Sequence, residues 1–238
     1  MKSVNSRSSI RFLIFLIFFG GFFYTTRSGA DELYKEFQPK ESSRQRETIE
    51  WSIIYMFGTN DQSKPRALLI GDSICNGYQS VVREYLEGKV NITYWAGSKC
   101  VTDPQYFEEL NMVLSGNRYN VITFNNGLHS LSSDRHEWEI AFRQAVLFIR
   151  EKTPDAKLLL VTSTPTENPE SDEASKELGD YAKKVAAELG LEVIDLYRTV
   201  KNSNEEEPWS DGVHFKRPVI NLQGKTVADA ILGSLTTN

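Results

Sequence analysis

The chain has 238 residues, of which 40% are hydrophobic and 25% charged, a composition typical of a globular protein with one sizeable core. Its formal net charge of -5 provides no basic surface for nucleic acid, so we expect no nucleic-acid partner. The sequence contains no cluster of metal-ligating residues and no cofactor motif, so we also expect neither a metal nor a cofactor.

The first thirty residues have the pattern of a secretory signal peptide. Basic residues precede the apolar run 12–24, and the small residues Ser28 and Ala30 lie at the -3 and -1 positions of a possible cleavage site. The run is shorter than the roughly 20 apolar residues that a membrane-spanning helix needs. We therefore predict that residues 1–30 are cleaved from an exported protein, periplasmic or secreted, with no stable membrane insertion afterwards. The alternative is an uncleaved membrane anchor.

The next segment, 31–65, is predicted to lead into the folded domain. Residues 31–48 are polar and charged and are interpreted as a surface segment, whereas 49–57 is apolar enough to pack on the domain as a short element. A loop at 58–65 follows. We assign the remainder, 66–238, to one domain, because it contains neither an internal repeat nor a low-complexity linker.

Short apolar runs alternate with longer amphipathic stretches along this domain. The runs, rich in β-branched and aromatic residues as buried strands are, cover 67–70, 90–95, 119–124, 157–162 and 191–196. The predicted helices cover about 76–88, 104–115, 134–152, 171–190 and 218–235. Strands separated by helices of this length indicate parallel βαβ units. The sequence therefore predicts a three-layer α/β/α sandwich with a mostly parallel five-stranded sheet, similar to flavodoxin.

Polar residues follow the predicted strands at the points where each strand ends. They are Asp72 and Ser73, Gly97 and Ser98, Asn125 and Asn126, Ser163 and Thr164, and, after the fifth strand, Asp211 and His214. Because the carboxyl ends of parallel strands meet at one edge of a sheet, this edge is the expected place for a functional site.

A serine hydroxyl needs a base to become a nucleophile, and the chain has three histidines as candidates. His136 lies at a predicted helix start and is interpreted as a solvated surface residue. Asp211 precedes His214 by three residues, so on a tight turn its carboxylate can reach Nδ1 and leave Nε2 facing Ser73. Alternatively, Ser73 only caps the following helix and the other two form a surface ion pair. His129 lies near a strand end, where it can line the site.

The chain contains two cysteines, Cys75 and Cys100. In an exported protein they can form a disulfide, although two cysteines are not a disulfide framework. The alternative is that both are small buried residues.

Several blocks of this sequence resemble the GDSL/SGNH hydrolases. Residues 68–74, Leu-Leu-Ile-Gly-Asp-Ser-Ile, resemble the nucleophile block of this family, and 211–214, Asp-Gly-Val-His, resemble its closing Asp-x-x-His block. Residues 125–128, Asn-Asn-Gly-Leu, are similar to the third block, and Gly97 falls where the family has a glycine after its second strand. The resemblance covers about 66–235.

This resemblance implies an SGNH-hydrolase fold and the functional residues of a serine esterase. Ser73 corresponds to the nucleophile, His214 to the base, and Asp211 to the residue that orients the base. The N–H of Gly97 and the side chain of Asn125 correspond to the oxyanion hole.

Further candidates lie near the same edge of the sheet. Asn126 is the alternative to Asn125 in the third block and a candidate for lining the substrate pocket. His129 and Thr164 can line the pocket or serve in packing. Trp51, Trp95 and Trp209 can stack on a sugar ring or be buried in the core.

From these residues we expect an exported carboxylic ester hydrolase. We favour a small-molecule or polysaccharide ester as substrate, with removal of small acyl groups such as acetyl from carbohydrate, because export suits a polymer outside the cytoplasm. The alternatives are a lipase or thioesterase acting on longer acyl chains, an acyltransferase with the same triad, and a non-catalytic carbohydrate-binding or interaction protein. The sequence gives no oligomeric state.

Overall fold

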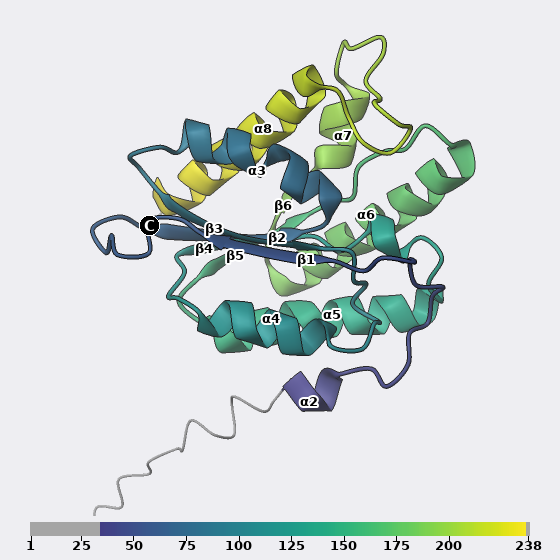
Figure 1. The fold of residues 1–238 in the computed structure, drawn as a ribbon, viewed down its shortest axis with the longest axis horizontal. Helices are drawn as coiled ribbons and strands as arrows, with labels where there is room; N and C mark the ends of the chain where they lie inside the picture. Colours follow the sequence, from purple (N-terminus) through teal and green to yellow (C-terminus); the bar gives the residue numbers. More distant parts are fainter. Residues whose placement is uncertain (1–33, 237–238) are drawn as a thin grey trace, which may run out of the picture.

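The computed structural model describes residues 34–236, and its centre is a six-stranded sheet (Figure 1). The strands are β1 (Ser52–Met56), β2 (Arg66–Gly71), β3 (Asn91–Gly97), β4 (Val121–Phe124), β5 (Lys157–Val161) and β6 (Glu192–Ile194). They lie in the order β1-β3-β2-β4-β5-β6, and all neighbours are parallel except β1 and β3. The predicted signal peptide and its cleavage site lie outside the described residues.

Helices cover both faces of this sheet. They are α2 (Tyr34–Phe37), α3 (Ser73–Tyr85), α4 (Tyr106–Ser115), α5 (Arg135–Lys152), α6 (Pro169–Leu189), α7 (Leu196–Lys201) and α8 (Arg217–Thr236), with a short 3₁₀ turn at Leu128–Ser130. One apolar core lies between the sheet and α3, α7 and α8. The other lies between the sheet and α4, α5 and α6 (Figure 1). The predicted three-layer α/β/α sandwich is therefore confirmed.

The predicted number of five strands is wrong, because β1 adds an antiparallel edge strand. It comes from the apolar stretch 49–57, which we expected to pack as a short element. Its pairing partner is β3, with Ser52 opposite Gly97. No local signal in the sequence indicates a strand pair so far apart along the chain. The five predicted strands are present with shifted ends, and the short helix α7 was not predicted.

Helix α3 begins at Ser73, three residues before the predicted start. Asp72 is its N-cap, and the Asp72 carboxylate accepts a hydrogen bond from the Ile74 N–H at 2.9 Å. Such a cap satisfies one of the free N–H groups at a helix start. Asp72 therefore fixes Ser73 as the first helical residue, immediately after β2.

The strand order places Ser73 at the topological switch point of the sheet. From β2 the chain crosses first to β3 on one side and later to β4 on the other. Loops leaving the carboxyl ends of these neighbouring strands diverge, and the crevice between them is where doubly wound α/β folds bind ligands.

The two cysteines are buried and free. Cys75 belongs to the core on the α3 side of the sheet and Cys100 to the core on the α4 side, so the sheet separates them and the disulfide alternative is not formed. Burial raises the pKa of the Cys75 thiol to about 12, which keeps it in its unreactive neutral form.

The prediction that 31–48 is a surface segment is wrong at Arg44, which is only 7% exposed. Its guanidinium binds Asp103, Glu50 and the Ser98 carbonyl oxygen. A charged side chain is buried only when it finds such partners, and these partners come from later parts of the chain. Within 34–236, no helix combines the length and apolar character needed to cross a membrane.

Helices α3 and α8 approach each other closely at Gly224. A Cβ atom at this position would lie 2.5 Å from the Val81 Cβ and 3.1 Å from the Tyr78 carbonyl oxygen. We expect Gly224→Ala to destabilise the protein by about 1–3 kcal/mol, since overpacking outweighs the better helix propensity of alanine. Thermal unfolding followed by circular dichroism measures this change.

Gly233→Ala on the same helix is the matched control, because no atom lies within 4 Å of where its Cβ would be. We expect its Tm to be unchanged or higher. A Tm for Gly224→Ala equal to that of the wild type would show that the two helices move apart at little cost.

Candidate active site

Ser73, His214 and Asp211 come together at the carboxyl edge of the sheet. The Ser73 Oγ lies 2.8 Å from His214 Nε2, and His214 Nδ1 lies 2.7 Å from Asp211 Oδ2. In the tautomer that satisfies both contacts, Nδ1–H donates to the carboxylate and Nε2 accepts the serine proton. The three side chains therefore form the continuous hydrogen-bonded chain that serine nucleophiles require.

A tight turn aligns Asp211 with His214. One carboxylate oxygen, Oδ1, accepts the backbone N–H of His214 at 2.7 Å and of Val213 at 3.1 Å, which leaves Oδ2 for the imidazole. Gly212 has a φ of +84°, in the left-handed region that favours glycine. The local sequence thus accounts for the orientation of the carboxylate.

The same hydrogen bonds control the ionisation of Asp211. The His214 N–H is the largest contribution, followed by the His214 ring and the Val213 N–H, and together they lower the pKa of Asp211 to about 2. The side chains of Asp211 and His214 are 56% and 44% exposed. Because water screens the charges of such exposed groups, hydrogen bonds rather than burial hold this pair in place.

Ser73 occupies a position that suits an anionic intermediate. As the first residue of α3, it has a backbone N–H without a partner in the helix, at the positive end of the helix dipole. Gly71 lets the first turn of α3 pack closely on the end of β2, since a Cβ at this position would lie 2.6 Å from the Cys75 Cβ.

The two residues predicted for the oxyanion hole lie on the strands that flank β2. The Ser98 N–H donates to the Trp51 carbonyl oxygen at 3.0 Å, so in this alternating ladder the N–H of Gly97 points the other way, toward β2. Asn125 follows β4 and is buried, and its Nδ2 donates one hydrogen to the Val161 carbonyl oxygen at 2.9 Å. Their roles in stabilising an oxyanion stay predictions.

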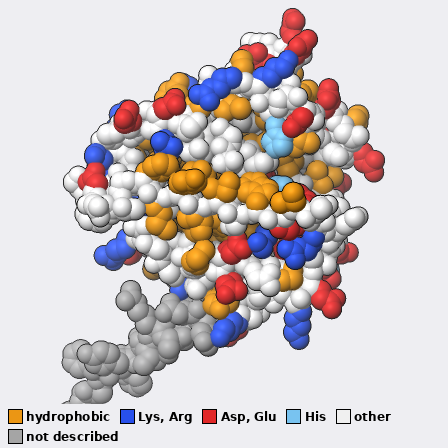
Figure 2. Space-filling model, in the orientation of Figure 1, with side chains coloured by type: hydrophobic (Ala, Val, Ile, Leu, Met, Phe, Trp, Pro, Cys, Tyr) orange, Lys and Arg blue, Asp and Glu red, His pale blue; other side chains and the backbone are white. Residues whose placement is uncertain are grey.

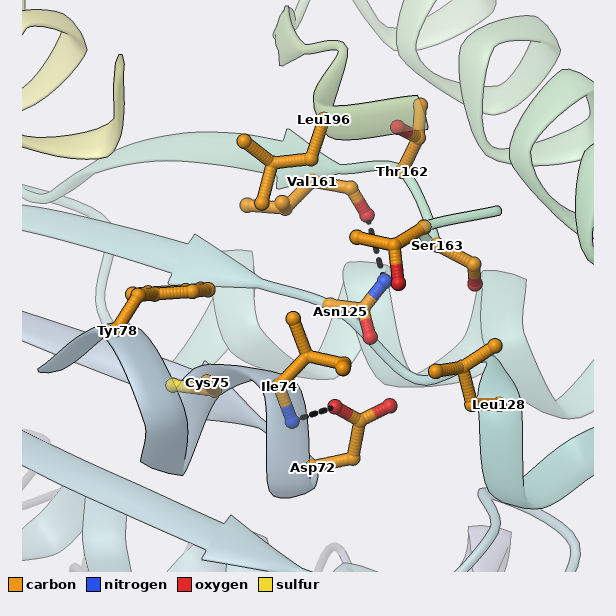
Figure 3. A pocket seen from close by; sticks show the side chains of 11 residues that line it. Asp72, Ile74, Cys75, Tyr78, Asn125, Leu128, Val161, Thr162, Ser163 and Leu196 are labelled. Atoms are coloured by element: carbon orange, nitrogen blue, oxygen red, sulfur yellow. Dashed lines mark hydrogen bonds between the residues drawn. The ribbon is translucent and has the colours of Figure 1, made fainter. Parts of the chain in front are cut away.

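A small cavity lies between the start of α3 and the ends of β4 and β5 (Figure 3). Its lining includes Asp72, Asn125, Leu128, Ser163 and Thr164. The Asp72 Oδ2 and the Thr164 Oγ1 are both buried in this region without a hydrogen-bond partner. Thr164 thus lines the small cavity and not the open cleft that contains the serine.

The open cleft above Ser73 has a volume of about 570 Å³. It is lined by Glu47, Trp51, Ser73, Leu128, His129, Leu131, Asp211, Val213 and His214. Figure 2 shows histidine side chains near one end of a band of hydrophobic side chains that follows β1. This volume is within the range of sites that bind small molecules.

His129 forms one wall of the cleft together with the segment that precedes β1. Its Nδ1 contacts a carboxylate oxygen of Glu47, and the edge of its ring meets Trp51 at a centroid distance of 6.2 Å. No sequence pattern indicated Glu47, because the contact between positions 47 and 129 exists only in the folded chain.

Asn126 points away from the cleft. Its Oδ1 accepts hydrogen bonds from the Val101 N–H and the Ser130 hydroxyl, each at 3.0 Å, and its Nδ2 donates to the Lys99 carbonyl oxygen at 2.9 Å. Of the two neighbouring asparagines, Asn125 therefore lines the small cavity, and Asn126 holds the loop after β3.

No protein-family model matches the chain, and no curated protein matches its sequence. Solved structures match its fold. A member of the lipolytic protein G-D-S-L family from Veillonella parvula is 18% identical with a TM-score of 0.60, covering 70% of this chain and 98% of its own. A candidate SGNH hydrolase from Slackia heliotrinireducens is 14% identical with a TM-score of 0.58, covering 71% and 100%. The acetylxylan esterase Axe2 from Geobacillus stearothermophilus is 16% identical with a TM-score of 0.57, covering 73% and 95%.

The depressed pKa of Asp211 is open to a direct test. We expect His214→Ala to raise it from about 2 toward the ordinary aspartate value of ~3.9, since the ring hydrogen bond is lost, while the two backbone N–H donors keep it below that value. Carboxyl chemical shifts from ¹³C NMR follow the titration.

The sign of the effect on stability follows from the same shift. Because the folded-state pKa lies below the ordinary value, the stabilisation is present above about pH 4 and is lost as the pH falls toward 2. Asp195, which caps α7 and pairs with Lys183, is the internal control and should titrate identically in both proteins. An unchanged Asp211 midpoint in His214→Ala would mean that the backbone donors alone set its pKa.

Proposed function

We propose that this chain, which has the fold of the GDSL/SGNH hydrolases, is an exported serine esterase that removes small acyl groups, such as acetyl, from carbohydrate. The observation that carries the esterase is the hydrogen-bonded chain of Ser73, His214 and Asp211 at the switch point of the sheet. Export rests on the signal-peptide pattern of residues 1–30.

The proposed reaction begins when the Ser73 Oγ attacks the ester carbonyl carbon and His214 Nε2 accepts the hydroxyl proton. The carbonyl oxygen becomes an oxyanion, which the N–H groups of Ser73 and Gly97 and the amide of Asn125 stabilise. His214 then gives its proton to the leaving alcohol, and an acyl-serine remains. Water attacks this ester with His214 again as base, which releases the carboxylic acid and restores the serine.

The lining of the cleft supports an alcohol with many hydroxyl groups. The Glu47 carboxylate, the His129 ring and the Trp51 indole lie on one wall. Carboxylates bind hydroxyl groups, and indole rings pack on the apolar faces of sugars. Among the lining residues the other apolar side chains are Leu128, Leu131 and Val213, which suits a short acyl group more than a long chain. A structural neighbour that is an acetylxylan esterase adds support to this choice.

The triad is tested with p-nitrophenyl acetate. We expect Ser73→Ala and His214→Ala to lower kcat by at least ~10³-fold, since each removes a participant in every proton transfer. Asp211→Asn should lower kcat by roughly 10²- to 10⁴-fold, because the imidazole loses its orienting charge.

His136→Ala is the matched control, since His136 is exposed at the start of α5 and is not among the residues that line the cleft above Ser73. Its kcat should equal that of the wild type. Hydrolysis that survives in Ser73→Ala at the wild-type rate would rule out the serine mechanism.

Acyl specificity is tested by comparing the hydrolysis of p-nitrophenyl acetate with that of p-nitrophenyl octanoate. The carbohydrate substrate is tested with an acetylated oligosaccharide, and acyl transfer is tested with the same sugar carrying a free hydroxyl group. We expect kcat/KM for acetate to exceed that for octanoate by about tenfold or more, because the few apolar side chains of the cleft bury little of a long chain. Release of acetate from the oligosaccharide measures the proposed reaction. A preference for octanoate would favour the lipase or thioesterase alternative, and acetyl transfer to the free sugar hydroxyl would favour the acyltransferase.

A further inference from the structure

A buried cluster of charged and polar side chains lies beside the cleft, formed by Arg44, Glu50, Ser98 and Asp103. The side chains of Arg44 and Asp103 are 2% and 0% exposed. The Arg44 Nε donates to Asp103 Oδ2 at 3.0 Å, and the Arg44 Nη2 donates to Glu50 Oε1 at 3.1 Å. We refer to these four residues as the arginine cluster.

The cluster joins the segment before β1 to the loop after β3. Arg44 donates to the Ser98 carbonyl oxygen at 3.0 Å. The Ser98 hydroxyl donates to Glu50 Oε2 at 2.7 Å and accepts the Trp51 N–H at 2.9 Å. The main chain and the side chain of Ser98 are therefore both held by the preceding segment.

The rest of the loop, 99–103, is held from two sides. Asp103 Oδ2 accepts the Cys100 N–H at 2.8 Å, which links the arginine cluster to the middle of the loop. From the opposite side, Asn126 binds the Val101 N–H and the Lys99 carbonyl oxygen. Hydrogen bonds from both sides therefore restrain the backbone of this loop.

Burying these charges costs solvation free energy, so their partners must be well placed. Burial acts against the charge of Arg44, but the hydrogen bond and the charge of Asp103 outweigh it and raise the pKa of the guanidinium. Burial likewise acts against the Glu50 carboxylate, but the Ser98 hydroxyl and Arg44 outweigh it and lower its pKa. Arg44 and Glu50 are therefore both ionised at neutral pH.

Gly97 is the residue immediately before this loop, and it packs against the same segment. A Cβ at Gly97 would lie 3.2 Å from the Trp51 carbonyl oxygen, so the segment covers the strand end closely. The Ser98 N–H donates to that same oxygen at 3.0 Å, so contacts with residues 44–51 hold Gly97 on its carboxyl side and the ladder of the sheet holds it on its amino side.

We propose that Arg44 is a positioning residue, which acts through Ser98 and Asp103 to hold Gly97, and with it the Gly97 N–H, beside Ser73. The inference rests on the proposed esterase function, in which the Gly97 N–H binds the oxyanion. In such sites a displacement of about 1 Å costs up to ~10²-fold in rate. Arg44 touches neither the serine nor the substrate in this role.

The test compares Arg44→Met with the wild type on p-nitrophenyl acetate. We expect kcat to fall by about 10- to 100-fold while KM changes by less than about threefold, since only the transition state uses the oxyanion donors. A trifluoromethyl ketone, which adds to the serine and forms an oxyanion, should bind more weakly by the same factor as the loss in kcat. If Arg44 serves only the stability of the fold, the folded fraction of the variant keeps the wild-type kcat and the wild-type affinity for the trifluoromethyl ketone.

Arg66→Met is the matched control, because Arg66 is also a buried arginine, 5% exposed, that binds main-chain carbonyl oxygens. It begins β2, at the opposite end of the strand from Ser73. We expect this variant to lose thermal stability and to keep the kcat and inhibitor affinity of the wild type.

If Arg44→Met does not fold, the milder variant Ser98→Ala tests the positioning role instead. It removes the hydroxyl contacts with Glu50 and Trp51 and should lower kcat by several-fold, with the same weakening of inhibitor binding. Wild-type kcat in either folded variant, with Ser73→Ala inactive, overturns the positioning role and leaves the proposed function intact. A wild type without any ester hydrolysis that depends on Ser73 overturns the proposed function, and this inference with it.

Discussion

The hydrogen bond between Ser73 and His214 is the contact on which the arrangement of the site depends. It joins residues 141 positions apart at 2.8 Å, so two separate parts of the chain must be placed with sub-ångström accuracy. Ser73 begins α3, and His214 closely precedes α8, and these two helices pack on the same face of the sheet. The two helices also contact each other closely at Gly224, so the packing of this face supports the relative placement of the two catalytic candidates.

The segment before β1 supplies hydrogen-bond partners at the carboxyl edge of the sheet. Strand ends leave backbone groups and polar side chains that need partners, and in this protein Arg44, Glu50 and Trp51 provide them. The same segment contributes Glu47 and Trp51 to the wall of the cleft. One stretch of chain therefore both orders the loop after β3 and shapes the surface that a substrate meets.

The exposure of the site is consistent with the proposed substrate class. Asp211 and His214 are about half exposed, and the cleft is open to solvent along its length. A bulky carbohydrate can approach such a site without the movement of a covering segment. Hydrogen bonds within the turn at 211–214 keep the carboxylate aligned where burial does not.

The sequence by itself determined the α/β class and the order of most elements, because hydrophobic periodicity is a local property. It also singled out Ser73, Asp211 and His214 as candidates, since the Gly-Asp-Ser and Asp-x-x-His blocks are local, and the structure brings their side chains together. Tertiary structure alone decided that Ser52 pairs with Gly97, that Arg44 is buried against Asp103, and that Asn126 turns to the loop while Asn125 stays beside the cavity. The first two contacts join residues that are distant along the chain, and the third distinguishes two adjacent asparagines of the same chemistry. The free energy that favours each contact arises only when the chain folds and brings the two residues together.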